Sequence, residues 1–202
     1  MRYRVYILVL AAVMFPLSAY AEDVAAGFVK HCSAQPQRSA SFCTCALKAF
    51  SDKLRKARKT ELQKLERTVP ENRKNLLADP AMSEGKVSAA CDLHDRALEE
   101  ERLASLAKFA GDQASYDQHT RKKLAFFADK KTLVESYGAT HQTVGALVAG
   151  SFCDDRNKLE QIKKDFKQGE NGLFPELLRN LENNPNYASV PISLTATRAG
   201  CS

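Results

Sequence analysis

The sequence predicts an all-α fold, a disulfide-stapled bundle of about six to eight helices with an extended C-terminal tail. Ala, Leu, Lys, Glu and Arg dominate the chain, and these residues are strong helix formers. We find no segment with the alternation of apolar and polar residues that marks a half-buried strand. Six cysteines follow a segment that is typical of an export signal, and exported thiols form disulfides.

The first element is this export signal, residues 1–21. It begins with two arginines, continues with the apolar run Val5–Phe15 and ends in Ala19-Tyr20-Ala21. This pattern predicts a cleavable Sec-type signal peptide, cut between Ala21 and Glu22, and therefore a periplasmic or secreted protein. The apolar run is shorter than the roughly 20 residues that span a bilayer, so we expect no stable membrane insertion.

The first half of the remaining chain predicts a series of helices separated by loops and breaks. Val24, Phe28 and Cys32 mark the first, and a second begins near Ser41 with an apolar face at three- and four-residue spacing. Thr60-Glu61-Leu62-Gln63 resembles a capping box that opens another turn or two. Val69-Pro70 should end that turn, because proline removes a helical hydrogen bond, and Pro70 can serve as the first residue of the next short helix.

The second half predicts longer helices. One starts at Asp79-Pro80 or Ser83, carries a drifting apolar stripe and ends at Gly111. Another runs from near Ser115 to Gly138. A third begins at Thr140 and continues without a break to Phe166, and a short one covers 175–181. We expect residues 22–202 to form a single helical domain, whose one plausible seam is 111–115.

The cysteines allow fifteen complete pairings. Cys43 and Cys45 point about 200° apart on a helix, so they should have different partners. Cys43 and Cys91 both share faces with apolar residues, which favours a bond between them. The preferred set is Cys32–Cys45, Cys43–Cys91 and Cys153–Cys201, and the swap Cys32–Cys43 with Cys45–Cys91 is almost equally favoured. All six are interpreted as structural.

His94 is the one candidate for chemistry. It lies on an otherwise apolar helical face between Asp92 and Asp95, and a buried histidine that donates to a carbonyl or carboxylate is the simplest interpretation. The alternative is a small exported enzyme or a metal-binding site centred on these three residues. We predict no catalytic, cofactor-binding or metal-ligating residue from a recognised motif, because hydrolase, phosphate-binding and redox spacings are all lacking from the sequence.

The charge pattern argues against nucleic acid as a partner. The chain is +6 overall, and its densest basic run, 53–59, spreads around a helix instead of forming a stripe. An exported, cross-linked helical protein without a catalytic pattern is most readily interpreted as a non-enzymatic binder of a partner protein, in an inhibitory, immunity-type or assembly role. A further alternative is a carrier of a small amphipathic ligand, held near Phe127, Val148 and Phe152. The sequence specifies neither the partner nor the oligomeric state.

Overall fold

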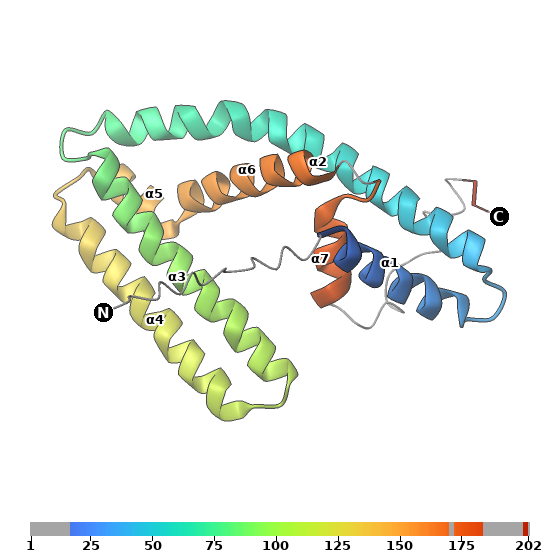
Figure 1. Cartoon of the computed structure of the whole chain (residues 1–202). Coiled ribbons are helices and arrows are strands. Elements are labelled where there is room, and N and C mark those ends of the chain that lie inside the picture. The colour runs from blue at the N-terminus through green and yellow to red at the C-terminus, as the bar shows by residue number, and fades with distance from the viewer. Residues whose placement is uncertain (1–16, 170–171, 184–199, 202) are drawn as a thin grey trace, which may run out of the picture. The chain divides into compact units, whose positions relative to one another are not determined.

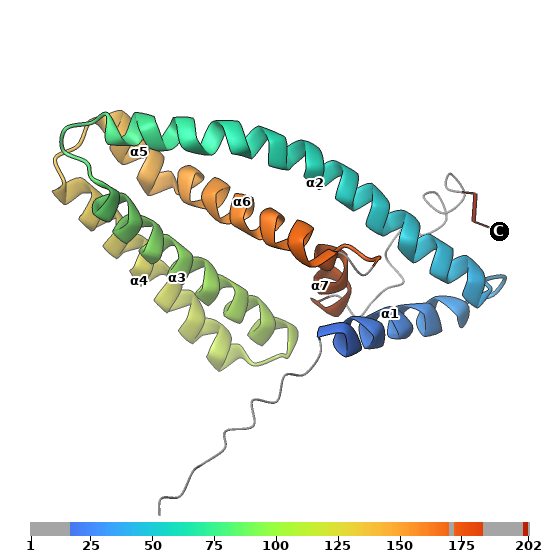
Figure 2. The same ribbon diagram turned by 45° about the horizontal axis from the view of Figure 1, so that its top comes forward.

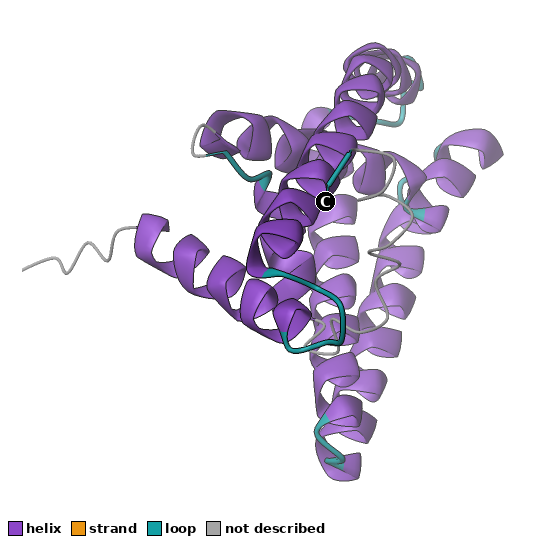
Figure 3. Ribbon diagram, turned by 90° about the vertical axis from the view of Figure 1, so that its right-hand side faces the viewer, coloured by secondary structure: helices purple, strands orange, loops and turns teal. Residues whose placement is uncertain are grey.

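The computed structural model describes residues 17–169, 172–183 and 200–201. These residues form seven α-helices and no strand (Figure 3), and three disulfides join them, so the predicted all-α, disulfide-stapled fold is confirmed. The first 16 residues of the predicted signal peptide lie outside the described residues, and α1 begins at Leu17, upstream of the expected cleavage position. The predicted extended tail from residue 186 also lies almost wholly outside them.

The chain divides into two compact units. Residues 1–56 and 165–202 form the terminal unit, and residues 57–164 form the central unit. Both boundaries fall inside helices, α2 (Ala40–Leu77) and α6 (Ser151–Gln168). The predicted seam at 111–115 lies instead at the turn between two helices of the central unit. That residues 22–202 behave as a single domain stays a prediction.

Helix α2 is continuous, so the breaks predicted at Thr60 and at Val69-Pro70 are wrong. Proline inside a helix costs about 3 kcal/mol because it removes a hydrogen bond and crowds the preceding turn. Around Pro70, however, the side chains of Leu65, Val69 and Leu76 are all buried. Each buried aliphatic side chain contributes about 1.5–3 kcal/mol, which offsets the penalty and keeps the turns helical.

The terminal unit is built around α1 (Leu17–Ser33), the start of α2 and α7 (Pro175–Asn183). Its core combines aromatic, aliphatic and cysteine side chains: Phe28, Cys32, Cys43, Ala46, Leu47 and Leu181. The buried Ser51 hydroxyl accepts a hydrogen bond from the Phe174 N–H at 2.6 Å. Arg179 forms two hydrogen bonds with the buried carboxylate of Asp165, at 2.9 and 2.6 Å. These bonds fix the chain that leads into α7.

The central unit contains α3 (Glu84–Phe109), α4 (Gln113–Ser136), α5 (His141–Ala149) and the first part of α6. Ser83 caps α3 and Thr140 caps α5, as predicted, whereas Asp112 and not Ser115 caps α4. The single helix predicted from Thr140 onward is wrong, because Gly150 separates α5 from α6 with a left-handed backbone (φ +76°).

The disulfide pairing differs from the preferred prediction in all three bonds. The structure pairs Cys32 with Cys43, Cys45 with Cys201 and Cys91 with Cys153. Cys43 and Cys91 are fully buried as expected, but they lie in different units, and each is bonded to a buried cysteine of its own unit. The alternative pairing was half right: the predicted Cys32–Cys43 bond is confirmed, and the predicted Cys45–Cys91 bond is wrong. Cys45, only partly buried on the flank of α2, reaches the C-terminal cysteine instead.

Candidate functional site

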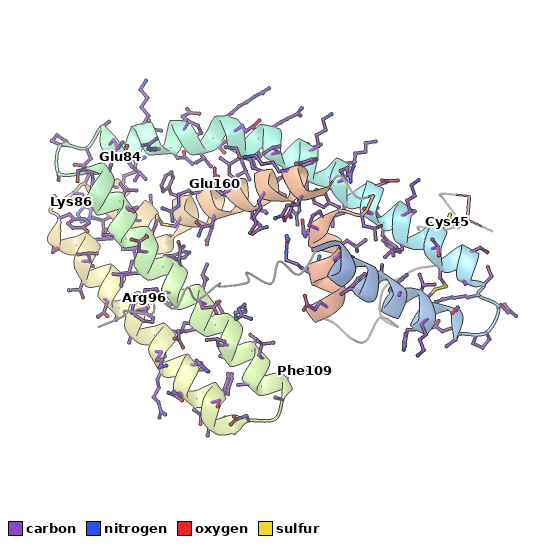
Figure 4. The ribbon with its side chains drawn as sticks, viewed as in Figure 1. Cys45, Glu84, Lys86, Arg96, Phe109 and Glu160 are labelled. Carbon is purple, nitrogen blue, oxygen red and sulfur yellow. A yellow bond between two sulfur atoms is a disulfide. The ribbon has the colours of Figure 1, made fainter. Side chains whose placement is uncertain are left out.

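Helices α3 and α4 form a long antiparallel hairpin within the central unit (Figures 1 and 2). We call residues 84–97 and 127–136 its base, and residues 98–126 its distal half. Figure 4 marks the two ends, with Glu84 and Lys86 at the base and Phe109 at the far end of α3. Cross-hairpin contacts keep the helices in register, from Lys86 with Tyr137 at the base to Lys108 with Tyr116 near the turn.

The base contains a chain of three titratable side chains from three helices. Lys130 Nζ of α4 lies 3.0 Å from Nδ1 of His94 on α3, and His94 Nε2 lies 2.7 Å from Asp154 Oδ1 on α6. His94 is 3% exposed and Lys130 1%, whereas the Asp154 side chain is 52% exposed. Both ring nitrogens of His94 therefore have partners, and only the carboxylate end of the chain reaches solvent.

Burial and charge act on Lys130 in opposite directions. Desolvation lowers the pKa of its ammonium, and the negative charge of Asp154 partly opposes this shift. The Phe127 ring lies 5.1 Å from Lys130 Nζ, and its centroid is 6.0 Å from that of His94. An ammonium is a donor only, so it can bond to Nδ1 only while that nitrogen carries no proton.

The surroundings leave the imidazole little freedom. A Cβ atom placed on Gly150 would lie 2.2 Å from His94 Cε1, so the bare backbone at this glycine is needed for the ring to fit. One turn before His94, Cys91 is bonded to Cys153, and both cysteines are fully buried. The disulfide and the hydrogen-bonded chain together attach α6 to the base of the hairpin.

The sequence identified His94 but not its partners. Asp92 is exposed, and Asp95 bonds to Arg156 at 3.0 Å and Asn157 at 2.5 Å instead of the imidazole. Lys130 and Asp154 are 36 and 60 residues away in the chain, and nothing in the local pattern connects them to His94. The one available clue was that Asp154 follows Cys153, but this needed the Cys91–Cys153 bond to be known.

The distal half is different, because its apolar side chains face solvent. Among the described residues, every large apolar side chain classed as exposed lies in this hairpin: Leu98 (36% exposed), Leu106 (47%), Phe109 (76%) and Leu124 (59%). Along α3 the stripe predicted from the sequence runs from buried Val87 and Cys91 to these exposed positions. We call Leu98, Leu106, Phe109 and Leu124 the distal apolar face.

Helix geometry places most of this face on one side of the hairpin. Leu98 lies one turn beyond His94, and Leu124 one turn beyond Phe127, so both continue the side on which those two rings meet. The two leucines are also level, because the contacts Arg96–Phe126 and Glu101–Lys123 lie on either side of them. Phe109 follows Leu98 by eleven residues, about three full turns.

Charged residues flank the face without favouring either sign. Glu99 pairs with Arg102, Glu100 with His119 at 2.6 Å and Glu101 with Lys123 at 3.0 Å. Pairs of this kind are each worth little when exposed. The pairs Glu100–His119 and Glu101–Lys123 join α3 to α4, whereas Glu99–Arg102 lies within α3.

Comparison of the chain with known protein families, curated proteins and solved structures gives no match. Within the described residues no helix is long and apolar enough to cross a membrane, and no group of three His, Cys, Asp or Glu side chains is arranged to hold a metal ion. Of the residues suggested for a ligand carrier, Phe152 is buried and Phe127 packs on His94. The carrier and enzyme alternatives stay predictions.

Proposed function

We propose that this protein binds a partner protein through the distal apolar face of the α3–α4 hairpin. The observation that carries the proposal concerns the part of the chain that the structure describes, where the four exposed large apolar side chains all lie in one hairpin. Single exposed apolar residues are ordinary, whereas several gathered in one structural element favour a role in protein binding. Phenylalanine and leucine anchors flanked by charged residues match the composition expected of a binding patch, an apolar centre within a polar rim.

The base of the hairpin supports this role mechanically. A buried disulfide and the Lys130–His94–Asp154 chain hold α3, α4 and α6 together. A binding face on helices that are fixed in this way loses little conformational entropy on association. The N-terminal segment predicts export to the periplasm or beyond, and such oxidising compartments are where disulfides persist.

The test compares two double variants of the oxidised protein as affinity baits. Phe109→Ser/Leu124→Ser removes the two most exposed members of the face. Ala110→Ser/Ala125→Ser changes the exposed neighbour of each and serves as the matched control. Proteins captured from the envelope fraction of the native host are quantified, and the dissociation constant of the leading one is measured by calorimetry.

We expect the first variant to weaken binding by about 30-fold or more, because central anchors typically contribute about 2 kcal/mol or more. The control should bind like the unmodified protein. Both variants should keep their helical circular dichroism, since the substituted residues are exposed. Equal capture by both variants, or capture of nothing specific by the unmodified protein, contradicts the proposal.

A further inference from the structure

The three disulfides differ in how far the protein covers them. All six cysteines lie within the described residues, and every one is paired. Four of them are no more than 1% exposed: Cys32, Cys43, Cys91 and Cys153. Cys45 and Cys201, in contrast, are only partly buried. The Cys45–Cys201 bond is therefore the one disulfide whose two cysteines have surface open to solvent in the folded protein.

The local structure around Cys45 explains this difference. Cys43, two residues earlier on α2, belongs to the core of the terminal unit, and the two side chains point about 200° apart. Cys45 therefore lies on the flank of α2, near its start (Figure 4), and Cys201 packs against the outside of the core. The charged residue nearest to Cys45 along α2 is Lys48, which is exposed and one turn away. A positive charge close to a cysteine favours its thiolate form.

We propose that the Cys45–Cys201 disulfide is a site of thiol–disulfide exchange with a protein dithiol, which acts as the reductant, and that the other two disulfides are closed to this reaction. Exchange requires a thiolate to approach a disulfide sulfur directly, so access decides which bond reacts. The chain is the substrate of the exchange and not its catalyst, in agreement with the lack of redox spacing in its sequence. The proposal is independent of what binds the distal apolar face.

The exchange takes place in two steps. One thiolate of the reductant forms a bond to one sulfur of the Cys45–Cys201 pair, and the other sulfur leaves as a thiolate. The second thiolate of the reductant then attacks the mixed disulfide, which closes the reductant's own disulfide and releases the remaining cysteine. Two electrons and two protons pass from the dithiol to Cys45 and Cys201, which end as thiols.

The contacts of the terminal unit predict that its helices stay in place when this bond opens. The Cys32–Cys43 bond still joins α1 to α2, and the hydrogen bonds described above still hold the chain that leads into α7. The freed Cys45 thiolate cannot pass the exchange on to Cys43, because Cys43 is fully buried and points away from it. Exchange thus detaches Cys201 from α2 without opening a second disulfide.

The experiment follows each disulfide separately in the full oxidised protein. The protein is incubated at neutral pH without denaturant, in one series with dithiothreitol and in a second with reduced thioredoxin. Samples are quenched with acid, free thiols are alkylated with N-ethylmaleimide, and the labelled cysteines are identified by peptide mass spectrometry. We expect Cys45 and Cys201 to be labelled together and at least about tenfold faster than the other four, because buried disulfides react only after local unfolding.

Three outcomes of these series overturn the proposal. The first is labelling of Cys91 and Cys153, or of Cys32 and Cys43, as fast as that of Cys45 and Cys201. The second is opening of the exposed bond by dithiothreitol but not by thioredoxin, which excludes a protein dithiol. The third is loss of the helical circular dichroism signal as the first bond opens, because the proposed exchange takes place in the folded protein.

Cys45→Ser/Cys201→Ser is the matched variant, because it removes the proposed site and keeps the four buried cysteines. It should show no rapid labelling, and its four cysteines should react at the rate measured in the unmodified protein. Rapid labelling of the variant shows that the buried pairs are accessible and overturns the proposal. A variant that lacks the helical circular dichroism signal overturns it too, since opening this bond would then unfold the chain.

Discussion

The base and the distal half of the α3–α4 hairpin belong to the same two helices, but the base buries its apolar side chains and the distal half exposes them. At the base Ala90, Cys91 and Ala97 are fully buried, and a disulfide attaches α6. In the distal half Phe109 and Leu124 are more than half exposed. His94 lies in the base and His119 in the distal half. Two further pairs extend the comparison to the neighbourhood of the base, because Gly150 adjoins the His94 ring and Asp79 precedes α3, whereas Gly111 and Asp112 lie in the distal half. The difference teaches that residue type alone does not decide the surroundings of a side chain, because α5 and α6 cover one end of the hairpin and leave the other exposed.

The largest effect is expected from removal of the disulfide at the base. Cys91→Ala/Cys153→Ala opens a cross-link between residues 62 apart, which the loop-entropy model values at about 4 kcal/mol. Urea unfolding followed by circular dichroism measures the loss. If the double variant loses less than about 1 kcal/mol, the base is held mainly by its packing, and the contrast between the two ends is weaker than we infer.

The glycines provide the next comparison. Both have a left-handed backbone, φ +76° at Gly150 and +74° at Gly111, but only at Gly150 would a Cβ collide with another residue, His94. Gly150→Ala should cost about 2–5 kcal/mol of unfolding free energy, from backbone strain and overpacking together. Gly111→Ala should cost about 1 kcal/mol, from backbone strain alone. Equal losses in thermal or urea unfolding would show that the fit around His94 is looser than the distances indicate.

The smallest expected effect is on stability in strong acid, and it compares the carboxylates of Asp79 and Asp112. The Thr140 and Ala81 N–H groups lower the pKa of Asp79, and the hydroxyl and N–H of Ser115 lower that of Asp112. A lowered carboxyl pKa contributes stability above the unfolded value, near 3.9, that is lost as pH falls through the folded value.

Asp79 is 8% exposed, and its carboxylate accepts a hydrogen bond from the N–H of Thr140, 61 residues away in the chain. The Asp112 carboxylate instead accepts from Ser115, within the same turn. Asp79→Asn should therefore flatten the acid-induced loss of stability more than Asp112→Asn does. The measurement is the midpoint of acid unfolding, followed by circular dichroism below pH 5. A larger change for Asp112→Asn would reverse this part of the comparison.

Helix composition and two of the three helix caps discussed above were predictable, because they depend on neighbours in sequence. Ser83 and Thr140 were identified as helix starts from their own residues and the few that follow. Pro70 and Gly150 were misjudged in opposite directions. Burial of the α2 side chains keeps the helix continuous through Pro70, and the close approach of the His94 ring is compatible only with the bare backbone of Gly150, where α5 ends.

The candidate site shows the same division. The sequence by itself determined the helical class, the structural role of the cysteines and the apolar stripe along α3, because these follow from local spacing and composition. Tertiary structure alone decided which cysteines pair, that Lys130 and Asp154 flank His94, and where along α3 the stripe stops being covered. These outcomes depend on which segments pack together across 11 to 156 residues of chain. Local periodicity fixes the face of a helix but not the neighbour that this face meets.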